Sequence, residues 1–491
     1  MGQDTLGLQS TKEGAVARFF GKLLFIALLI ILFWSPTWFG TPQNNELQKT
    51  LVENSLNLKP ADPSVSSWVA AIYVALFQYS YPNRYLEILL FCAGAFGLLA
   101  LLFGAKVRLK THNVTYAGIG WALLMLAVMA SGKMCKIPEF RDNWGSALFI
   151  LYGVFFYLAT ICLNSAKKRE IACVIICLAL LIVSHGALIQ QCGGLERTRD
   201  LYAQKLGFDT FAKYSEAFLS TNHTPEELFT FNRLASARVT STFTSPNILA
   251  SYLMVAFFVA LGLARSSGSK AIRYLGYLAA ALALLTLFLT RSKSVIVIVS
   301  VLFIIWSYLL GKFGELPKKF WLIATFGALV YTALAFLFGY GANLGAKLNS
   351  SGSARLEYAK VALRMARQRV LQGYGVNSFA RWFKMYAKPD SEPTKFVHNT
   401  LLQMWAEFGI FAGLGWLLAM TLPMVNGWDV FKSSTRKDVL QLSCILAGLG
   451  FFVHCLIDFD FYVPGVTLTA LFIMAAGLNS AEIVNLNEAQ A

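Results

Sequence analysis

Charged residues are scarce in this sequence. Only 14% of the 491 residues are Asp, Glu, Lys or Arg, whereas soluble domains carry roughly 25%. Hydrophobic residues make up 56% of the chain, and the mean hydropathy is +0.56. This composition excludes a soluble globular enzyme, a disordered chain and a fibrous repeat protein.

The sequence also lacks the patterns of a membrane β-barrel and of a metal centre. Its apolar runs are continuous, whereas the strands of a barrel alternate polar and apolar residues. The eight cysteines include no C-x-x-C pair and no cluster with histidine, so a zinc or iron–sulfur site is not expected. We therefore predict neither a metal nor another cofactor.

Long apolar runs recur along the whole chain and predict an all-α polytopic membrane protein, a single integral domain over residues 1–491. A spanning helix needs about 20 mostly apolar residues. The first run lacks a small-residue cleavage site and is interpreted as a retained anchor, and the shorter run 68–81 as an interfacial helix. Twelve spans are predicted: 18–39, 83–104, 114–131, 145–163, 171–190, 247–264, 272–290, 294–310, 320–340, 400–425, 438–456 and 463–480.

Positive charges orient these spans. The net charge is +16, which in a soluble protein would suggest nucleic acid, but nucleic acid is not expected as a partner here. Cytoplasmic loops of membrane proteins are rich in Lys and Arg. The N-terminal tail and five alternate connections carry three such residues each. Both termini are therefore predicted to be cytoplasmic.

Two long connections, 191–246 and 341–399, are predicted to be periplasmic loops with short helices. The second contains ten Lys and Arg but three acidic residues. Long translocated loops escape the orienting rule, so this excess indicates an anionic partner, with lipid headgroups as the alternative. Cys135 and Cys192 also fall outside, where they could form a disulfide or remain two separate thiols.

Three residues of the outer face are the main candidates for chemistry. His398 opens the tenth span, where a neutral imidazole could act as a general base or simply anchor the helix. Arg291 lies in a very short turn, where its guanidinium could bind phosphate or snorkel to headgroups. Arg355 follows a Ser-Gly-Ser stretch that resembles a helix start, and a helix N-terminus also attracts anions.

Weaker signals complete the set. Gly373 and Gly375 permit a tight turn, which is their default interpretation. His454 and Asp458 are spaced i, i+4 and are expected to form an orienting or structural pair. Asp458 and Asp460 spell the D-x-D of metal-dependent glycosyltransferases, but a metal would need further oxygen ligands. The span interiors hold almost no charge, which argues against the alternative of a lipid-linked glycan transporter.

Four segments carry a resemblance to a known family. They are R-V-T-S-T-F-T-S-P-N at 238–247, T-R-S at 290–292, G-Y-G-V-N-S-F at 373–379, and H-N at 398–399 followed by E-F-G-I-F-A-G at 407–413. Over residues 235–465 the chain resembles the O-antigen ligase superfamily, which includes polysaccharide polymerases and O-oligosaccharyltransferases. Ser241 stands where the family usually has glycine.

The resemblance implies a metal-independent, inverting glycan transfer from undecaprenyl pyrophosphate to an acceptor hydroxyl at the periplasmic face of the bacterial inner membrane. It implies His398 as base, and Arg291, Arg355 and Arg238 as pyrophosphate-binding residues. The acceptor is a lipid A–core sugar for a ligase, which we favour modestly, a growing glycan for a polymerase, or a protein. The sequence does not separate these three. Supporting residues are expected at Asn399, Glu407, Gly373, Gly375, His454 and Asp458.

Overall fold

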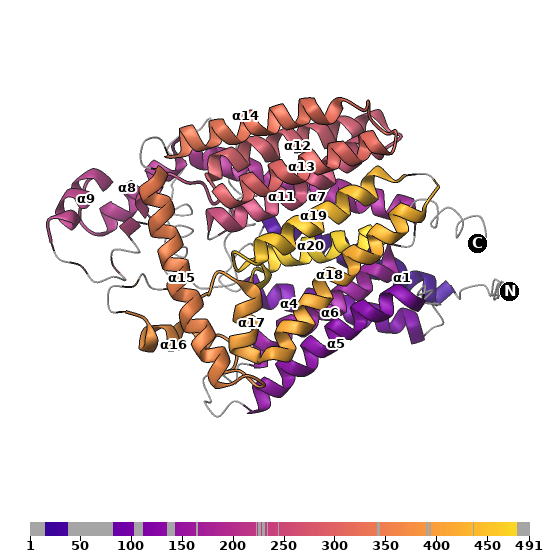
Figure 1. Cartoon of the computed structure of the whole chain (residues 1–491), viewed down its shortest axis with the longest axis horizontal. Helices are drawn as coiled ribbons and strands as arrows, with labels where there is room; N and C mark the ends of the chain where they lie inside the picture. Colours follow the sequence, from indigo (N-terminus) through magenta and orange to yellow (C-terminus); the bar gives the residue numbers. More distant parts are fainter. Residues whose placement is uncertain are drawn as a thin grey trace.

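All regular structure in the described part of this computed structural model is helical, which agrees with the predicted all-α class (Figure 1). The structure describes residues 15–37, 82–102, 111–134, 143–163, 165–221, 223, 227, 231–232, 234–243, 245–340, 344–388, 391, 394–435 and 437–478. The predicted interfacial run 68–81 and Cys135 lie outside these residues.

The first half of the chain supplies helices of the bundle and a small helical extension beside it. In Figure 1 the extension, α8 and α9, projects from one end of the bundle. The helices of this half are α1 (Ala15–Thr37), α4 (Pro82–Leu102), α5 (Thr111–Met134), α6 (Asn143–Cys162), α7 (Ala166–Ile189), the π-helical turn η2 (Gln190–Gly194), α8 (Leu195–Lys205) and α9 (Phe211–Leu219).

The second half supplies the remaining helices of the bundle, among them the most buried one, and the helices that cross its end. Its elements are α11 (Pro246–Ser266), α12 (Lys270–Thr290), α13 (Lys293–Lys312), α14 (Phe320–Tyr340), α15 (Leu344–Gln368), α16 (Phe379–Tyr386), α17 (Thr400–Phe408), α18 (Ile410–Ser433), α19 (Val439–Cys455), the 3₁₀ turn η4 (Asp460–Tyr462) and α20 (Pro464–Gly477).

Seven described helices are long and apolar enough to cross a membrane, judged by length and composition. They are Val16–Thr37, Ala166–Lys205, Pro246–Ser266, Lys270–Thr290, Lys293–Lys312, Phe320–Phe338 and Ile410–Ser433. Shorter apolar helices occupy positions of the other predicted spans: Leu89–Leu99, Gly118–Met134, Ser146–Cys162, Val439–Cys455 and Pro464–Gly477. The number twelve and the sidedness of the loops stay predictions.

Burial separates the central helices from those that face outward. α11 packs against α7, α12 and α19, and 89% of the residues in its apolar stretch are buried. α14, at the edge of the bundle in Figure 1, has only 17% of the residues in its apolar stretch buried. An apolar helix surface that no protein covers is what a lipid-facing helix presents, because lipid tails are as apolar as the side chains.

Small residues let the helices approach closely. On α5, Gly120 lies against the backbone of Leu418 and Ala419, and Gly415 of α18 lies against Leu124. Glycines at such contacts bring helix backbones together, which strengthens van der Waals packing in lipid. This contact fixes α18, and therefore the end of α17, against the first half of the chain.

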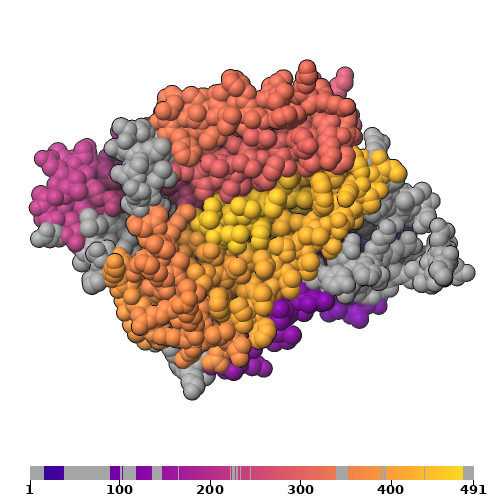
Figure 2. All heavy atoms as spheres, viewed as in Figure 1, coloured from indigo at the N-terminus to yellow at the C-terminus, as the bar shows by residue number. Residues whose placement is uncertain are grey.

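The loop predicted at 341–399 is mostly helical, and its first helix lies across the end of the bundle (Figure 1). In the space-filling view of Figure 2, the orange residues of this region form one surface, with yellow residues of the C-terminal helices between them and the salmon residues of α12 to α14. Many of the basic residues of this segment thus lie on the helices α15 and α16 (Phe379–Tyr386) and not on an irregular loop.

The predicted span 400–425 is wrong at its start, because the helix is broken at Gly409. The backbone of Gly409 has φ +90°, which interrupts α17 and lets α18 begin at Ile410. The Ile410 N–H donates to the carbonyl of Val370 at 2.8 Å. Glycine adopts this positive φ without the steric cost that a side chain brings.

We expect Gly409→Ala to destabilise the protein for two reasons. The alanine Cβ would collide with the Leu371 carbonyl, and the alanine backbone would have to adopt a positive φ. Left-handed backbone costs a non-glycine residue about 1–3 kcal/mol. The midpoint of thermal unfolding in detergent should fall. Gly327→Ala, at an open position on α14, is the matched control and should leave the midpoint unchanged or raise it. Equal midpoints for the two variants would contradict the prediction.

Candidate active site

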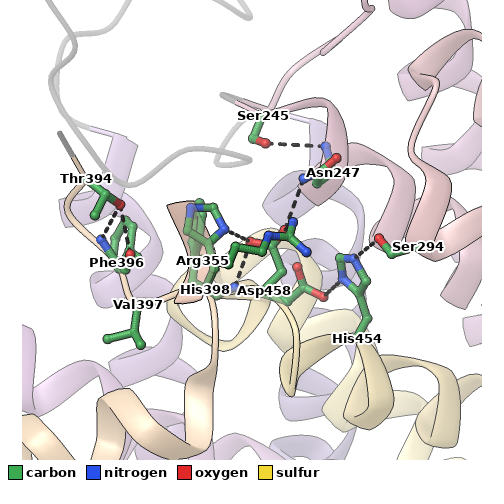
Figure 3. Close-up of polar contacts among 12 residues, drawn as sticks. Ser245, Asn247, Ser294, Arg355, Thr394, Phe396, Val397, His398, His454 and Asp458 are labelled. Atoms are coloured by element: carbon green, nitrogen blue, oxygen red, sulfur yellow. Dashed lines mark hydrogen bonds and ion pairs between the residues drawn. The ribbon is translucent and has the colours of Figure 1, made fainter. Parts of the chain in front are cut away.

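The carboxylate of Asp458 is the centre of a polar cluster at the end of the bundle (Figure 3). It lies between α19 and η4 and is fully buried. Its Oδ1 lies 3.0 Å from Nδ1 of His398 and accepts from the Phe459 N–H at 2.9 Å. Its Oδ2 accepts from Asn247 Nδ2 at 3.2 Å and lies 3.6 Å from Nη2 of Arg355. Both oxygens are therefore satisfied.

The charge of Asp458 is stabilised by this environment. Burial would raise the pKa of the carboxyl group, but the ion pair and hydrogen bond with His398, together with the positive charge of Arg355, hold it well below its usual value. Opposite charges within hydrogen-bond distance favour the ionised form. Asp458 is thus an anion throughout the physiological range.

His398 is held by the segment that carries Asp458. The residue has φ +56°, and the next two residues bind the same segment. Asn399 donates through Nδ2 to the carbonyl of Leu456 at 2.8 Å, and Thr400 donates through Oγ1 to the carbonyl of Asp458 at 3.1 Å. Asn399 also caps the N-terminus of α17. These bonds fix the position of the imidazole.

The contact with Asp458 decides which nitrogen of His398 is basic. A carboxylate can only accept, so Nδ1 must donate to it, and in the neutral ring Nε2 then carries the lone pair. The ring stacks on Tyr358 of α15 at 5.7 Å, and Phe459 approaches it edge-on at 5.0 Å. The side chain is 23% exposed. The geometry is that of an oriented base with limited access to its surroundings.

Arg355 does not lie at a helix N-terminus, and that part of the sequence prediction is wrong. α15 begins at Leu344, so the Ser-Gly-Ser stretch at 351–353 lies within the helix. Helix-forming neighbours on both sides override its weak helix propensity. Arg355 points toward Asp458 (Figure 3) and its side chain is 33% exposed. The structure therefore brings Arg355 and His398 together, on the two oxygens of one carboxylate.

Arg238 is tied to the turn between α12 and α13. Its Nε donates to the carbonyl of Thr290 at 2.8 Å, and its Nη2 donates to Oδ1 of Asn247 at 2.6 Å. The Ser292 hydroxyl donates to the same oxygen at 3.2 Å. With two donors on its oxygen and Asp458 beside its nitrogen, Asn247 has one consistent amide orientation. It links Arg238 and the turn to the Asp458 cluster.

Arg291 lies within this turn, in the left-handed conformation (φ +51°) that ends α12. Its two neighbours in sequence, Thr290 and Ser292, belong to the network just described. Left-handed backbone at a non-glycine residue is sparse in proteins and clusters at functional sites. A role for the Arg291 guanidinium in binding phosphate stays a prediction.

Ser241 adopts the backbone conformation that glycine would favour, with φ +50°. Its N–H and that of Thr240 both donate to Oε1 of Gln190, at 2.8 and 2.9 Å. Its hydroxyl donates to the carbonyl of Val183 at 2.6 Å. These contacts compensate for the strain of a left-handed backbone at a residue that has a side chain. No sequence pattern indicates that Gln190, 51 residues away, supports the backbone at Ser241.

Gly373 and Gly375 form the tight turn that their spacing predicts. Both have positive φ, +63° and +99°, and a side chain on Gly373 would collide with the backbone of Glu407 and Phe408. The Gly375 N–H donates to the carbonyl of Glu407 at 2.8 Å. The turn therefore docks on the end of α17, one helix away from His398.

Glu407 supports the same region from inside. Its carboxyl group is fully buried, accepts from the Phe379 N–H at 3.3 Å and from the Tyr462 hydroxyl at 3.2 Å. Burial raises its pKa to about 7, although these hydrogen bonds oppose the shift. Glu407 thus joins three segments around α17 and does not itself contact His398 or Asp458 in any described hydrogen bond.

His454 pairs with Asp460, and the predicted pair of His454 with Asp458 is wrong. Nδ1 of His454 lies 2.5 Å from Oδ2 of Asp460. The i, i+4 rule applies only within one helix, but α19 ends at Cys455 and the chain then turns. Asp458 is thereby aimed at His398 and Asp460 at His454.

The residues that sequence reasoning missed have modest signals. Asn247 is a polar residue in the first turn of an apolar helix, directly after Ser-Pro, but its partners Ser292 and Asp458 lie 45 and 211 residues away in the sequence. Tyr358 has no distinguishing pattern. Within the described residues, no group of three or more His, Cys, Asp and Glu side chains is placed to hold a metal ion. Metal independence of any reaction stays a prediction.

Comparison with known families agrees with the motifs. Residues 278–417 match the family model described as O-antigen ligase. The match supports the O-antigen ligase superfamily. No curated protein matches the chain. The matched segment contains Arg291, Arg355, His398 and Glu407, and the superfamily is associated with membrane glycosyltransferase and ligase activity.

Glu407→Gln should flatten the dependence of stability on pH. Because the folded-state pKa of about 7 lies above the ordinary 4.5, stability from this group is full below pH 4.5 and is lost as the pH rises through 7. Between pH 5 and 8 the wild type should lose about 3 kcal/mol more than the variant. Thermal unfolding in detergent across this range measures it. Glu216→Gln, exposed on α9, should keep the wild-type profile, and a wild-type profile for Glu407→Gln would refute the assignment.

Proposed function

We propose that this chain transfers a glycan from undecaprenyl pyrophosphate to an acceptor hydroxyl at the periplasmic face, as an O-antigen ligase of the bacterial inner membrane. The observation that carries the proposal is the His398–Asp458 pair, with Arg355 on the second carboxylate oxygen. It combines an oriented base with a cation in one small cluster. The O-antigen ligase match over residues 278–417 supports the reaction class.

In the proposed reaction His398 activates the acceptor. Nε2 removes the proton from the acceptor hydroxyl as its oxygen attacks the anomeric carbon of the donor sugar. The ring then becomes an imidazolium, which Asp458 stabilises through the 3.0 Å contact at Nδ1. The bond between the anomeric carbon and the pyrophosphate oxygen breaks on the opposite face, and the configuration is inverted.

The lipid pyrophosphate leaves with the bonding electron pair. It needs no general acid, but its charge needs fixed cations, and arginine supplies these in a bidentate geometry. Arg355 contacts Asp458 on the other oxygen from His398, and we assign it to the pyrophosphate with Arg291 and Arg238. Arg238 is bound to the turn that carries Arg291, which supports placing these two guanidinium groups in one subsite.

A polysaccharide polymerase is the second candidate, because it would use the same donor and the same base. The two reactions differ only in the acceptor, a lipid A–core sugar or a growing glycan. The long basic segment that contains α15 and α16 favours the polymerase, since such segments are frequent in polymerases, and the proposed chemistry is common to both.

His398→Ala should lower transfer by roughly 10²–10⁴-fold, the usual contribution of a positioned base, while donor binding is retained. Purified protein in detergent with a lipid-linked oligosaccharide donor measures both quantities.

Arg291→Ala should instead weaken donor binding, and Arg291→Lys should restore it only in part. His223→Ala, a histidine between α9 and α11, is the matched control. Wild-type transfer by His398→Ala would remove the base assignment.

Deletion of the gene should distinguish ligase from polymerase. Loss of a ligase leaves polymer of full length on the lipid carrier, whereas loss of a polymerase leaves single repeat units. We expect full-length polymer, and gel electrophoresis of the lipid-linked glycans measures it. Complementation with wild type should clear the accumulated species, but complementation with His398→Ala should not. Single repeats would support the polymerase, and no accumulation would contradict both.

A further inference from the structure

A second histidine–carboxylate pair lies beside the first and has no part in the proposed reaction. His454 and Asp460 are both fully buried. Besides His454, Oδ2 of Asp460 accepts from the Ser251 hydroxyl at 2.6 Å. The other nitrogen of His454, Nε2, lies 3.3 Å from Oγ of Ser294 (Figure 3). The histidine side of this buried pair thus ends on the Ser294 hydroxyl group.

Ser294 is the only partly exposed member of this chain of contacts among Ser294, His454 and Asp460. It lies in the first turn of α13, three residues after Arg291. Arg291 and Ser294 are therefore presented by the same turn, to which Arg238 and Asn247 are also bound.

Charge balance favours a protonated His454. A buried carboxylate is costly unless a cation accompanies it. The contact between His454 Nδ1 and Asp460 Oδ2 is an ion pair when the imidazole is protonated, and in that form both of its nitrogens donate. Nε2–H then donates to the Ser294 oxygen, and the Ser294 hydroxyl proton is left to be donated elsewhere.

We propose that Ser294 donates a hydrogen bond to a phosphate oxygen of the lipid pyrophosphate, in a subsite shared with Arg291. His454 and Asp460 are positioning residues that act through Ser294, because a charged donor on its oxygen makes the hydroxyl proton more positive. The bond strengthens as charge builds on the leaving group. This inference rests on the proposed function and adds a specific donor to it.

The same contacts have the order of a Ser-His-Asp triad, in which the serine would be a nucleophile. That role requires a neutral histidine whose Nε2 accepts the serine proton. A charged His454 does not accept it. A nucleophilic Ser294 would also form a covalent glycosyl intermediate and give retention, so the two roles have different products.

The test measures binding of undecaprenyl pyrophosphate to the purified full-length protein, with undecaprenol as the probe that lacks phosphate. Ser294→Ala should weaken undecaprenyl pyrophosphate binding roughly tenfold, the usual effect of losing a hydrogen bond to a charged group. Affinity for undecaprenol should not change. Ser294→Thr keeps the hydroxyl and should restore most of the affinity. Ser300→Ala, on the same helix with its hydroxyl bound to Thr332, is the matched control and should bind as wild type.

The outcomes separate this inference from the proposed function. Wild-type affinity of Ser294→Ala for undecaprenyl pyrophosphate would overturn the inference, as would an equal loss of undecaprenol binding. A glycosylated Ser294 peptide in mass spectra of the reacting enzyme would overturn it in favour of a nucleophile. His398→Ala should bind undecaprenyl pyrophosphate normally, so an active His398→Ala enzyme would refute the base while leaving the Ser294 result readable.

His454→Gln tests the positioning role. Its amide can still donate to Ser294 but carries no charge, so undecaprenyl pyrophosphate affinity should fall between those of wild type and Ser294→Ala. Wild-type affinity in a folded His454→Gln protein would overturn the role of His454. If this variant does not fold, the comparison of Ser294→Ala with Ser294→Thr still decides the inference.

Discussion

One buried negative charge organises the end of the bundle. Asp458 lies in a turn between two apolar helices, where a carboxylate without partners would cost several kcal/mol. Its partners come from α11, from α15 and from His398, two residues before α17. These segments are far apart in sequence, so the carboxylate is satisfied only when the helices that carry them have docked. The Asp458 carboxylate therefore both requires the docked helices and orients the imidazole of His398.

The helical class could be predicted from the sequence because it follows from composition and run length alone. Apolar runs of about 20 residues have few alternatives to a helix in lipid. The breaks were harder to predict. Gly409 lies within one continuous apolar run, and its positive φ depends on the approach of Leu371 and Val370. The start of α15 was missed for a related reason, since local propensity at 351–353 was too weak to end a helix.

The site was predicted in its parts but not in its connections. His398 and Arg355 were both expected on the outer face, and they share the carboxylate of Asp458. Asp458 itself was assigned to His454, because helical spacing was the only geometric rule available. Pairing across 60 residues depends on how α17 docks beside η4, and a single sequence does not contain that information. Arg291 was singled out by position, and the contacts of its neighbours place its turn in the same network as Asp458.

The left-handed backbone of Arg291 and His398 lowers stability at two positions whose side chains the proposed reaction needs. Each of these residues holds a conformation that costs roughly 1–3 kcal/mol for anything but glycine. Glycine would relax the chain there while removing the guanidinium or the imidazole. A library selected only for tolerance to heat or detergent would therefore favour glycine at Arg291, whereas at His398 the loss of a partner of the buried Asp458 opposes the change. Engineering this protein for handling needs a functional screen at every round, or the most stable descendants will be inert.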